Sequence, residues 1–202
     1  MKNNTEYLRS TEVIDYDNPC VSAKAKELAE GTGDPLLITK RCFNWVRDHI
    51  QHSMDHEKNP VTCIASDVLG EGTGFCFAKS HLLAALLRAN SIPTGFCYQR
   101  LCINDDGPPF CLHGLNAVYL QDFGWYRVDP RGNKEGVNAQ FCPPTEKLAY
   151  QPHVDGEMDL PEIWPDPLPR IVKPLRAYHT YDKFWEHLPH IEIIKINQQK
   201  DD

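Results

Sequence analysis

The sequence predicts an α+β fold, in which N-terminal helices are followed by an antiparallel β-sheet. Up to Pro93, apolar residues recur at helical spacing, and residues that cap helices stand at the segment boundaries. After Pro93 the chain turns to short segments rich in β-branched and aromatic residues, with turn-forming residues between them. Helices that precede strands, without alternation of the two, are typical of an α+β domain.

Three helices are expected before the sheet. Asn18 followed by Pro19, and Asp34 followed by Pro35, have the residue types that cap a helix and occupy its first turn. The third helix, CFAKSHLLAALLRAN at 76–90, is apolar on almost every side around its middle. It is therefore expected to be buried in the core.

Four strands are expected after the helices, at 95–103, 113–120, 124–130 and 136–142. The tight connection QDFG between the second and the third requires these two to run antiparallel. We therefore expect an antiparallel meander, against which the buried helix packs.

Two segments are expected to lie outside this framework. Residues 53–75 are rich in turn formers and predict a loop, and the tail 143–202 is rich in proline and aromatic residues, with a short helix near TYDKFWEHL. The tail has too few apolar residues for a second core, so it is expected to wrap the first as an arm. The sequence thus predicts one domain over 1–202, with a core at about 35–142 and an arm at 143–202.

Composition excludes several classes of protein. Asp and Glu (28) outnumber Lys and Arg (21), which argues against a nucleic-acid partner. The N-terminal residues lack the apolar stretch of a secretory signal, and no apolar run is long enough to cross a bilayer, so we expect a cytoplasmic protein without a membrane partner. In that compartment the eight cysteines stay reduced, and most are expected to be small buried hydrophobes.

Cys76 differs from the other cysteines in its position. It follows the glycine-rich stretch GEGTGF and opens the third helix. The positive end of a helix dipole and the unpaired N–H groups of the first turn favour a thiolate and can hold an oxyanion. Gly72 and Gly74, which lack side chains, would let a substrate approach. An inert buried thiol is the alternative.

A nucleophilic cysteine needs a histidine as base and a group that orients the imidazole. His113 opens one expected strand and Asp129 closes the next. If Tyr119 pairs with Trp125, His113 and Asp129 are diagonal neighbours on one face, about 5–8 Å apart at Cβ. A shift of one residue in this register would separate them.

The stretches GTGFCFAKSHLLAALLRANSIP, HGLNAVYL and GWYRVDP together resemble the core of the transglutaminase-like superfamily of papain-related cysteine enzymes. That family has a G-x-C leading into a helix that ends L-L-R-A-x-x-I-P, then a histidine heading a strand, then an aspartate in a W-x-x-x-D-P strand. The resemblance covers residues 70–130 and is that of a bacterial-type single-domain member. Two features depart from it: many members follow the histidine with A-W-V-E, and the arginine often found after I-P-A is missing from IPTGF.

The resemblance implies a cysteine-dependent enzyme that acts on peptide or protein amides through a thioester. Cys76 would be the nucleophile, His113 the general base and then acid, and Asp129 the orienting carboxylate. The family chemistry needs no metal or organic cofactor. Related enzymes place a side-chain oxyanion donor upstream of the nucleophile, where Gln51 and His52 are candidates. Hydrolysis, deamidation and amine transfer share the first half of the reaction and are not distinguished, and the oligomeric state is open.

Three alternatives remain. The same fold can serve as a catalytically inactive binding module, and one branch of the superfamily releases N-glycans from glycoproteins. A Cys/His metal site is the third alternative, with two possible sets of ligands: Cys97, Cys102, Cys111 and His113, or His49, His52 and His56. The first set lacks a tight knuckle, and the second is explained equally well by a solvated helix end.

Overall fold

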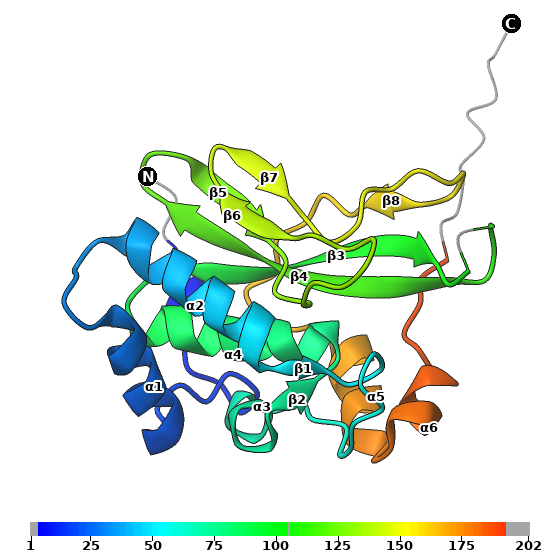
Figure 1. The fold of residues 1–202 in the computed structure, drawn as a ribbon, viewed down its shortest axis with the longest axis horizontal. Coiled ribbons are helices and arrows are strands. Elements are labelled where there is room, and N and C mark those ends of the chain that lie inside the picture. The colour runs from blue at the N-terminus through cyan, green and yellow to red at the C-terminus, as the bar shows by residue number, and fades with distance from the viewer. Residues whose placement is uncertain (1–3, 105, 193–202) are drawn as a thin grey trace, which may run out of the picture.

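The computed structural model describes residues 4–104 and 106–192 (Figure 1). A 3₁₀ turn, Thr5–Leu8, precedes the helices α1 (Pro19–Ala29), α2 (Pro35–His49), α3 (Ala65–Glu71), α4 (Cys76–Ala89), α5 (Pro169–Ala177) and α6 (Tyr181–Trp185). The strands are β1 (Gln51–His52), β2 (Thr73–Gly74), β3 (Thr94–Cys102), β4 (Phe110–Leu120), β5 (Gly124–Val128), β6 (Gln140–Cys142), β7 (Thr145–Lys147) and β8 (Met158–Asp159). The helices lie on one side of the main sheet, as Figure 1 shows, and the predicted α+β class is confirmed.

The expected helix caps form as the residue types require. The Asn18 side chain accepts a hydrogen bond from the backbone N–H of Cys20 (3.0 Å), and Asp34 accepts one from Leu36 (2.9 Å). Helix α4 is buried at every position from Cys76 to Arg88. The predicted central helix is therefore present, and it packs between the sheet and the other helices (Figure 1).

The main sheet has the strand order β5-β4-β3-β8, and all three pairings are antiparallel. Tyr119 pairs with Trp125, which is the register that the candidate site requires. In this register the start of β4 and the end of β5 lie at the same edge of the sheet, and β4 contacts the start of α4 there.

The last expected strand is wrong in both length and partner. Within 136–142 only β6 is a strand, and it pairs with β7 in a separate two-stranded sheet. An isolated bridge joins Lys134 and Val137. The chain turns back at Pro143–Pro144, so β6 forms a hairpin with β7 instead of extending the meander.

The expected loop at 53–75 is also wrong in part, because it contains α3. Gly72 ends this helix in the left-handed conformation (φ 65°), which glycine adopts without strain. Gly74 lies where an added Cβ would be only 3.0 Å from Ala78. Neither glycine lines the pocket beside Cys76, so local geometry accounts for both.

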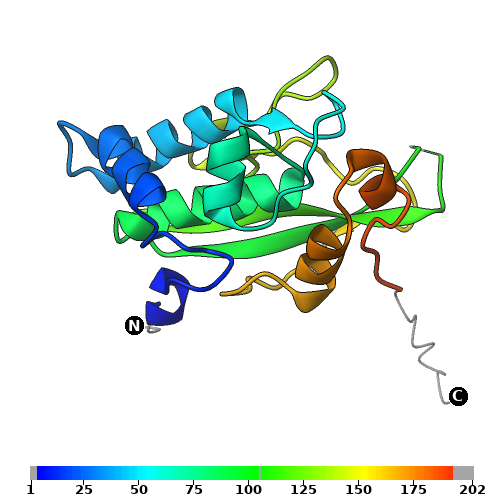
Figure 2. The ribbon, with the colours of Figure 1, turned by 90° about the horizontal axis from the view of Figure 1, so that it is seen from below.

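The arm contains the expected short helix, α6, and in addition β7, β8 and α5. Helices α5 and α6 lie on the same side of the sheet as α4, near the end of β3 and the start of β4 (Figure 2). Before them, the backbone of Trp164 forms a bridge with Phe96 of β3. The arm thus contacts both the sheet and the helical layer.

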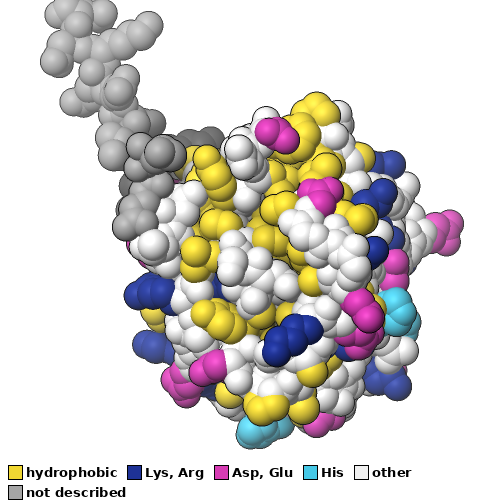
Figure 3. All heavy atoms as spheres, turned by 90° about the vertical axis from the view of Figure 1, so that its left-hand side faces the viewer, with side chains coloured by type: hydrophobic (Ala, Val, Ile, Leu, Met, Phe, Trp, Pro, Cys, Tyr) yellow, Lys and Arg dark blue, Asp and Glu magenta, His cyan; other side chains and the backbone are white. Residues whose placement is uncertain are grey.

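The surface carries charges of both signs. The chain has a formal net charge of −7, and on the face shown in Figure 3 acidic and basic side chains are interspersed. Within residues 4–104 and 106–192, no helix is both long and apolar enough to span a membrane.

Candidate active site

Cys76 is the first residue of α4, and Phe75 is the N-cap. The short strand β2 leads into it and pairs in parallel with β1, so that His52 stands opposite Gly74. Cys76 is 7 % exposed, and the hydroxyl of Ser80, one turn later, donates to its carbonyl (2.9 Å). The thiol is therefore held at the positive end of a buried helix.

Strand β4 approaches α4 closely at Gly114. The backbone N–H of Gly114 donates to the Cys76 Sγ at 3.5 Å, and a Cβ at this position would lie 2.5 Å from the ring of Phe77. Only glycine fits between the strand and this ring.

His113 and Asp129 form a buried pair. His113 Nε2 lies 2.8 Å from Asp129 Oδ2. Asp129 is fully buried and also accepts backbone N–H bonds from Arg131 and Ala149, both 3.1 Å. Burial alone would raise the Asp129 pKa, but the His113 charge and these hydrogen bonds lower it below its usual 3.8.

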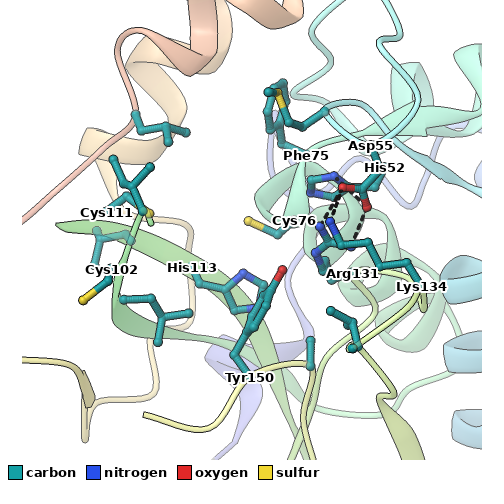
Figure 4. Close-up of a pocket in the computed structure, with 18 of the residues that line it drawn as sticks. His52, Asp55, Phe75, Cys76, Cys102, Cys111, His113, Arg131, Lys134 and Tyr150 are labelled. Atoms are coloured by element: carbon teal, nitrogen blue, oxygen red, sulfur yellow. Dashed lines mark hydrogen bonds and ion pairs between the residues drawn. The ribbon is translucent and has the colours of Figure 1, made fainter. Parts of the chain in front are cut away.

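The surroundings of His113 favour the charged form of its imidazole. Burial acts to lower the His113 pKa, but the negative charges of Asp129 and Cys76 outweigh it and raise the pKa to about 10. Because Asp129 engages Nε2, Nδ1 is the ring nitrogen left for the thiol. In Figure 4 the side chains of Cys76 and His113 point into the same space.

This space is a pocket of about 680 Å³. The structure brings His52 into its lining beside Cys76 and His113, whereas Gln51 is exposed and does not line it. His52 Nδ1 lies 3.6 Å from an Asp55 oxygen and has no hydrogen-bond partner among the residues that the structure describes. Burial and the nearby charge of Arg131 lower the His52 pKa well below 6.5, so this imidazole is neutral.

An ionic cluster beside His52 was not predicted from the sequence. Arg131 donates two hydrogen bonds to Asp55, at 2.5 and 2.9 Å, and Lys134 donates a third at 2.8 Å (Figure 4). These cations lower the Asp55 pKa, although burial opposes them. Arg131 directly follows the Asp129-Pro130 pair after β5, and this position is a weak sequence signal for a role near the site. No feature of the sequence singles out Asp55.

Tyr150, from the arm, packs against the imidazole ring of His113. Its ring meets the imidazole edge to face, with centroids 5.0 Å apart and planes at 89°. The Arg131 guanidinium lies 5.7 Å from the same ring centroid. Burial raises the Tyr150 pKa to about 12, so the phenol stays protonated.

Neither metal-ligand set forms a cluster. Among residues 4–104 and 106–192, no three His, Cys, Asp or Glu side chains are arranged to hold a metal ion. Cys97 packs with Leu115 and Ala117 on one face of the sheet, while Cys102 and Cys111 line the pocket. His49 ends α2, His52 lies in β1, and His56 is an exposed turn residue, so these three share no helical face.

Solved structures with limited similarity were found. A candidate cysteine protease from Cytophaga hutchinsonii has a TM-score of 0.47 and 20 % identity, over 65 % of this chain and 43 % of the other. The periplasmic domain of TgpA from Pseudomonas aeruginosa has a TM-score of 0.43 and 22 % identity, over 56 % and 42 % of the two chains. The matched part of this chain thus spans less than half the length of either protein.

A comparison with curated proteins found no significant match. The family model of the transglutaminase-like superfamily matches residues 22–130, which is more than half of the 202 residues. The matched segment contains Cys76, His113 and Asp129. The chain therefore belongs to the transglutaminase-like superfamily.

Proposed function

We propose that the protein is a cysteine-dependent enzyme that acts on amide bonds through a thioester at Cys76. The observation that carries this proposal is the buried 2.8 Å bond between His113 and Asp129, placed at the pocket into which Cys76 opens. A strand-end histidine or an Asp-Pro turn alone would be unremarkable. Cys76 from α4 and His113 from β4 meet at one pocket, and the buried Asp129 at the end of β5 bonds to His113, an arrangement that matches the requirements of nucleophilic catalysis.

In the first half-reaction, the Cys76 thiolate attacks the amide carbonyl and a C–S bond forms. The tetrahedral intermediate then collapses, the C–N bond breaks, and His113 Nδ1 gives its proton to the departing amine. Asp129 keeps the imidazole in position and stabilises its charged form. The thioester remains on Cys76.

The developing oxyanion needs hydrogen-bond donors. The first turn of α4 supplies backbone N–H groups, because such groups lack partners within the helix. We assign His52, rather than Gln51, as the side-chain donor. His52 lines the pocket, and its imidazole is neutral, so it can donate a hydrogen bond without adding a second cation near His113.

In the second half-reaction, an acceptor resolves the thioester. His113 takes a proton from water or from an amine, the acceptor attacks the carbonyl, and the C–S bond breaks to restore the thiolate. Water gives hydrolysis or deamidation, and an amine gives transfer. The pocket supports the shared first half for either outcome.

The test is turnover of a mixture of synthetic peptides that contain Gln, Asn and backbone amides, with hydroxylamine as a second acceptor. Mass spectrometry detects cleavage, deamidation or hydroxamate formation. We expect products with the wild-type protein, none with Cys76→Ala, and normal turnover with Cys20→Ala, which changes an exposed cysteine on α1.

Turnover retained by Cys76→Ala would end the proposal. A wild-type protein without turnover, whose Cys76 also reacts no faster with iodoacetamide than its other thiols, would favour the inactive binding module. Release of N-glycans from a glycoprotein by wild-type protein, without peptide turnover, would favour the glycan branch.

A further inference from the structure

The arm is attached to residues on both sides of the nucleophile. Phe184 of α6 is fully buried, and its ring centroid lies 4.4 Å from that of Phe75 and 6.4 Å from that of Phe77. Phe75 and Phe77 immediately flank Cys76 in the chain. The position of α6 is therefore fixed relative to the start of α4.

The arm is also attached beside the candidate base. Four residues after α6 ends at Trp185, the Pro189 carbonyl accepts a hydrogen bond from the backbone N–H of Leu112 at 2.7 Å. Leu112 directly precedes His113 on β4. Residues 184–189, which we call the strap, therefore run from the nucleophile helix to the strand that carries the imidazole. Figure 2 shows α6 beside the end of β3 and the start of β4.

Two strap side chains face the pocket. Trp185 and Leu188 line the 680 Å³ pocket that holds Cys76. Together with Ile103 they also line a second cavity of about 380 Å³, so the two spaces adjoin at the strap. Trp185 is 40 % exposed, so a large part of its indole is free to contact a ligand.

The walls next to the strap are apolar. Leu101, Ile103 and Leu112, from β3, β4 and the turn between them, line the same pocket. Buried charges of the pocket are engaged elsewhere: Arg131 holds Asp55, and Glu157 accepts backbone N–H bonds from Cys102, His153 and Val154. The part of the first pocket beside the strap therefore suits an apolar group, whereas the second cavity is also lined by the charged or titratable residues Arg100, Glu186, His190 and Glu192.

We infer that the strap forms a substrate subsite for a large apolar side chain in the acyl part of a peptide, and that Trp185 determines this specificity. The inference rests on the proposed function. The acyl part is the part that stays bound to Cys76 as the thioester, and the strap is anchored to the residues on either side of Cys76. The adjoining second cavity has room for the peptide to continue, so the substrate class is an extended peptide.

The experiment compares synthetic peptides that differ only in the residues around the reacting amide, with Phe or Leu replaced by Ser, Asp or Lys. We expect kcat/KM to be about tenfold to a hundredfold higher for the apolar peptides, as for other apolar pockets. Trp185→Ala should remove most of this preference and Trp185→Phe should keep it. Trp164→Ala is the matched control, because Trp164 is 38 % exposed and lines neither cavity.

Alkylation of Cys76 by iodoacetamide, which is too small to need the subsite, should be equal in wild-type, Trp185→Ala and Trp164→Ala proteins. Turnover without an apolar preference, or a preference that survives Trp185→Ala, overturns this inference and leaves the proposed function standing. A wild-type protein that turns over none of the peptides overturns the proposed function, and the inference with it.

Discussion

The family-matched segment and the arm contribute to one pocket in different ways. Residues 22–130 contain the three groups with proposed chemical roles: Cys76 on α4 and His113 on β4, which line the pocket, and the buried Asp129 after β5, which bonds to His113. The arm supplies Tyr150, Trp185 and Leu188, which give the pocket aromatic and apolar walls. In the proposed mechanism the reacting groups lie in the core, whereas the arm supplies the strap and supports the triad through the Ala149 N–H bond to Asp129 and the Tyr150 ring against His113. Substitutions in the core should change the rate for every substrate, and substitutions in the strap should change the choice among substrates.

The largest effect on the core side is expected from Asp129→Asn. It removes the charge that holds the His113 pKa at about 10, so the imidazolium and the thiolate lose a stabilising partner. Turnover should fall about 10³- to 10⁴-fold, as when other triads lose their carboxylate. Steady-state kinetics on the best peptide measures the effect. Asp122→Asn, in the exposed turn between β4 and β5, is the control. An unchanged rate in Asp129→Asn would remove this residue from the mechanism.

The next effect separates the two candidate oxyanion donors. His52→Ala should lower kcat by about 10²- to 10³-fold, the usual cost of one oxyanion donor. Gln51→Ala should leave kcat unchanged, because Gln51 is exposed and does not line the pocket. Equal rates in the two variants would contradict the assignment of His52.

A smaller effect tests the close approach of β4 to α4. In Gly114→Ala the new Cβ would meet the Phe77 ring at 2.5 Å, so the strand must move away from the thiol. We expect a loss of about 1–3 kcal/mol in the free energy of unfolding, typical of overpacking, together with reduced turnover. Gly70→Ala is the control, since nothing lies within 4 Å of its Cβ. If denaturant titration gave the two variants the same stability, the close packing at Gly114 would be refuted.

Another prediction concerns the pH dependence of stability. The His113 pKa rises from 6.5 when unfolded to about 10 when folded, so the imidazolium contributes stability that is complete below 6.5. This contribution is lost as pH rises through about 10. The difference in unfolding free energy between wild type and His113→Gln should therefore shrink over that window. Denaturant titrations at several pH values measure it, and a difference that grows toward pH 10 would show that the sign is wrong.

The contact between His113 and Asp129 was accessible from sequence because it depends on local strand pairing, whereas the roles of these residues were expected from the family resemblance. A short turn connects the strands of Tyr119 and Trp125 and makes them antiparallel, and the pairing of these two residues brings His113 to Asp129. Asn18 and Asp34 each cap the helix that begins at the next residue, Pro19 or Pro35. Each of these expectations rests on residues close together in the chain.

The expectations that were incomplete or wrong depend on contacts between distant residues. Helix α5 contains Pro174, which indicates an interruption when read locally, yet buried Ile171 and Leu175 hold the helix against the core. Asp55 is positioned by its hydrogen bond from Arg131, and Phe184 is positioned by its ring contacts with Phe75 and Phe77. No spacing in a single sequence encodes these partners, so the walls of the pocket emerged only from the structure.

The measurement that tests the central claim most directly is alkylation of all eight cysteines by iodoacetamide near neutral pH, followed residue by residue by mass spectrometry. Cys20 and Cys142 are exposed, whereas Cys76 is only 7 % exposed, so access alone would make Cys76 the slower of these. The account predicts that Cys76 is labelled faster than both, and that His113→Ala removes this advantage without changing the labelling of Cys20 or Cys142. Labelling of Cys76 that is slower than that of the exposed thiols, or that is unaffected by His113→Ala, would contradict an activated thiol–imidazole pair.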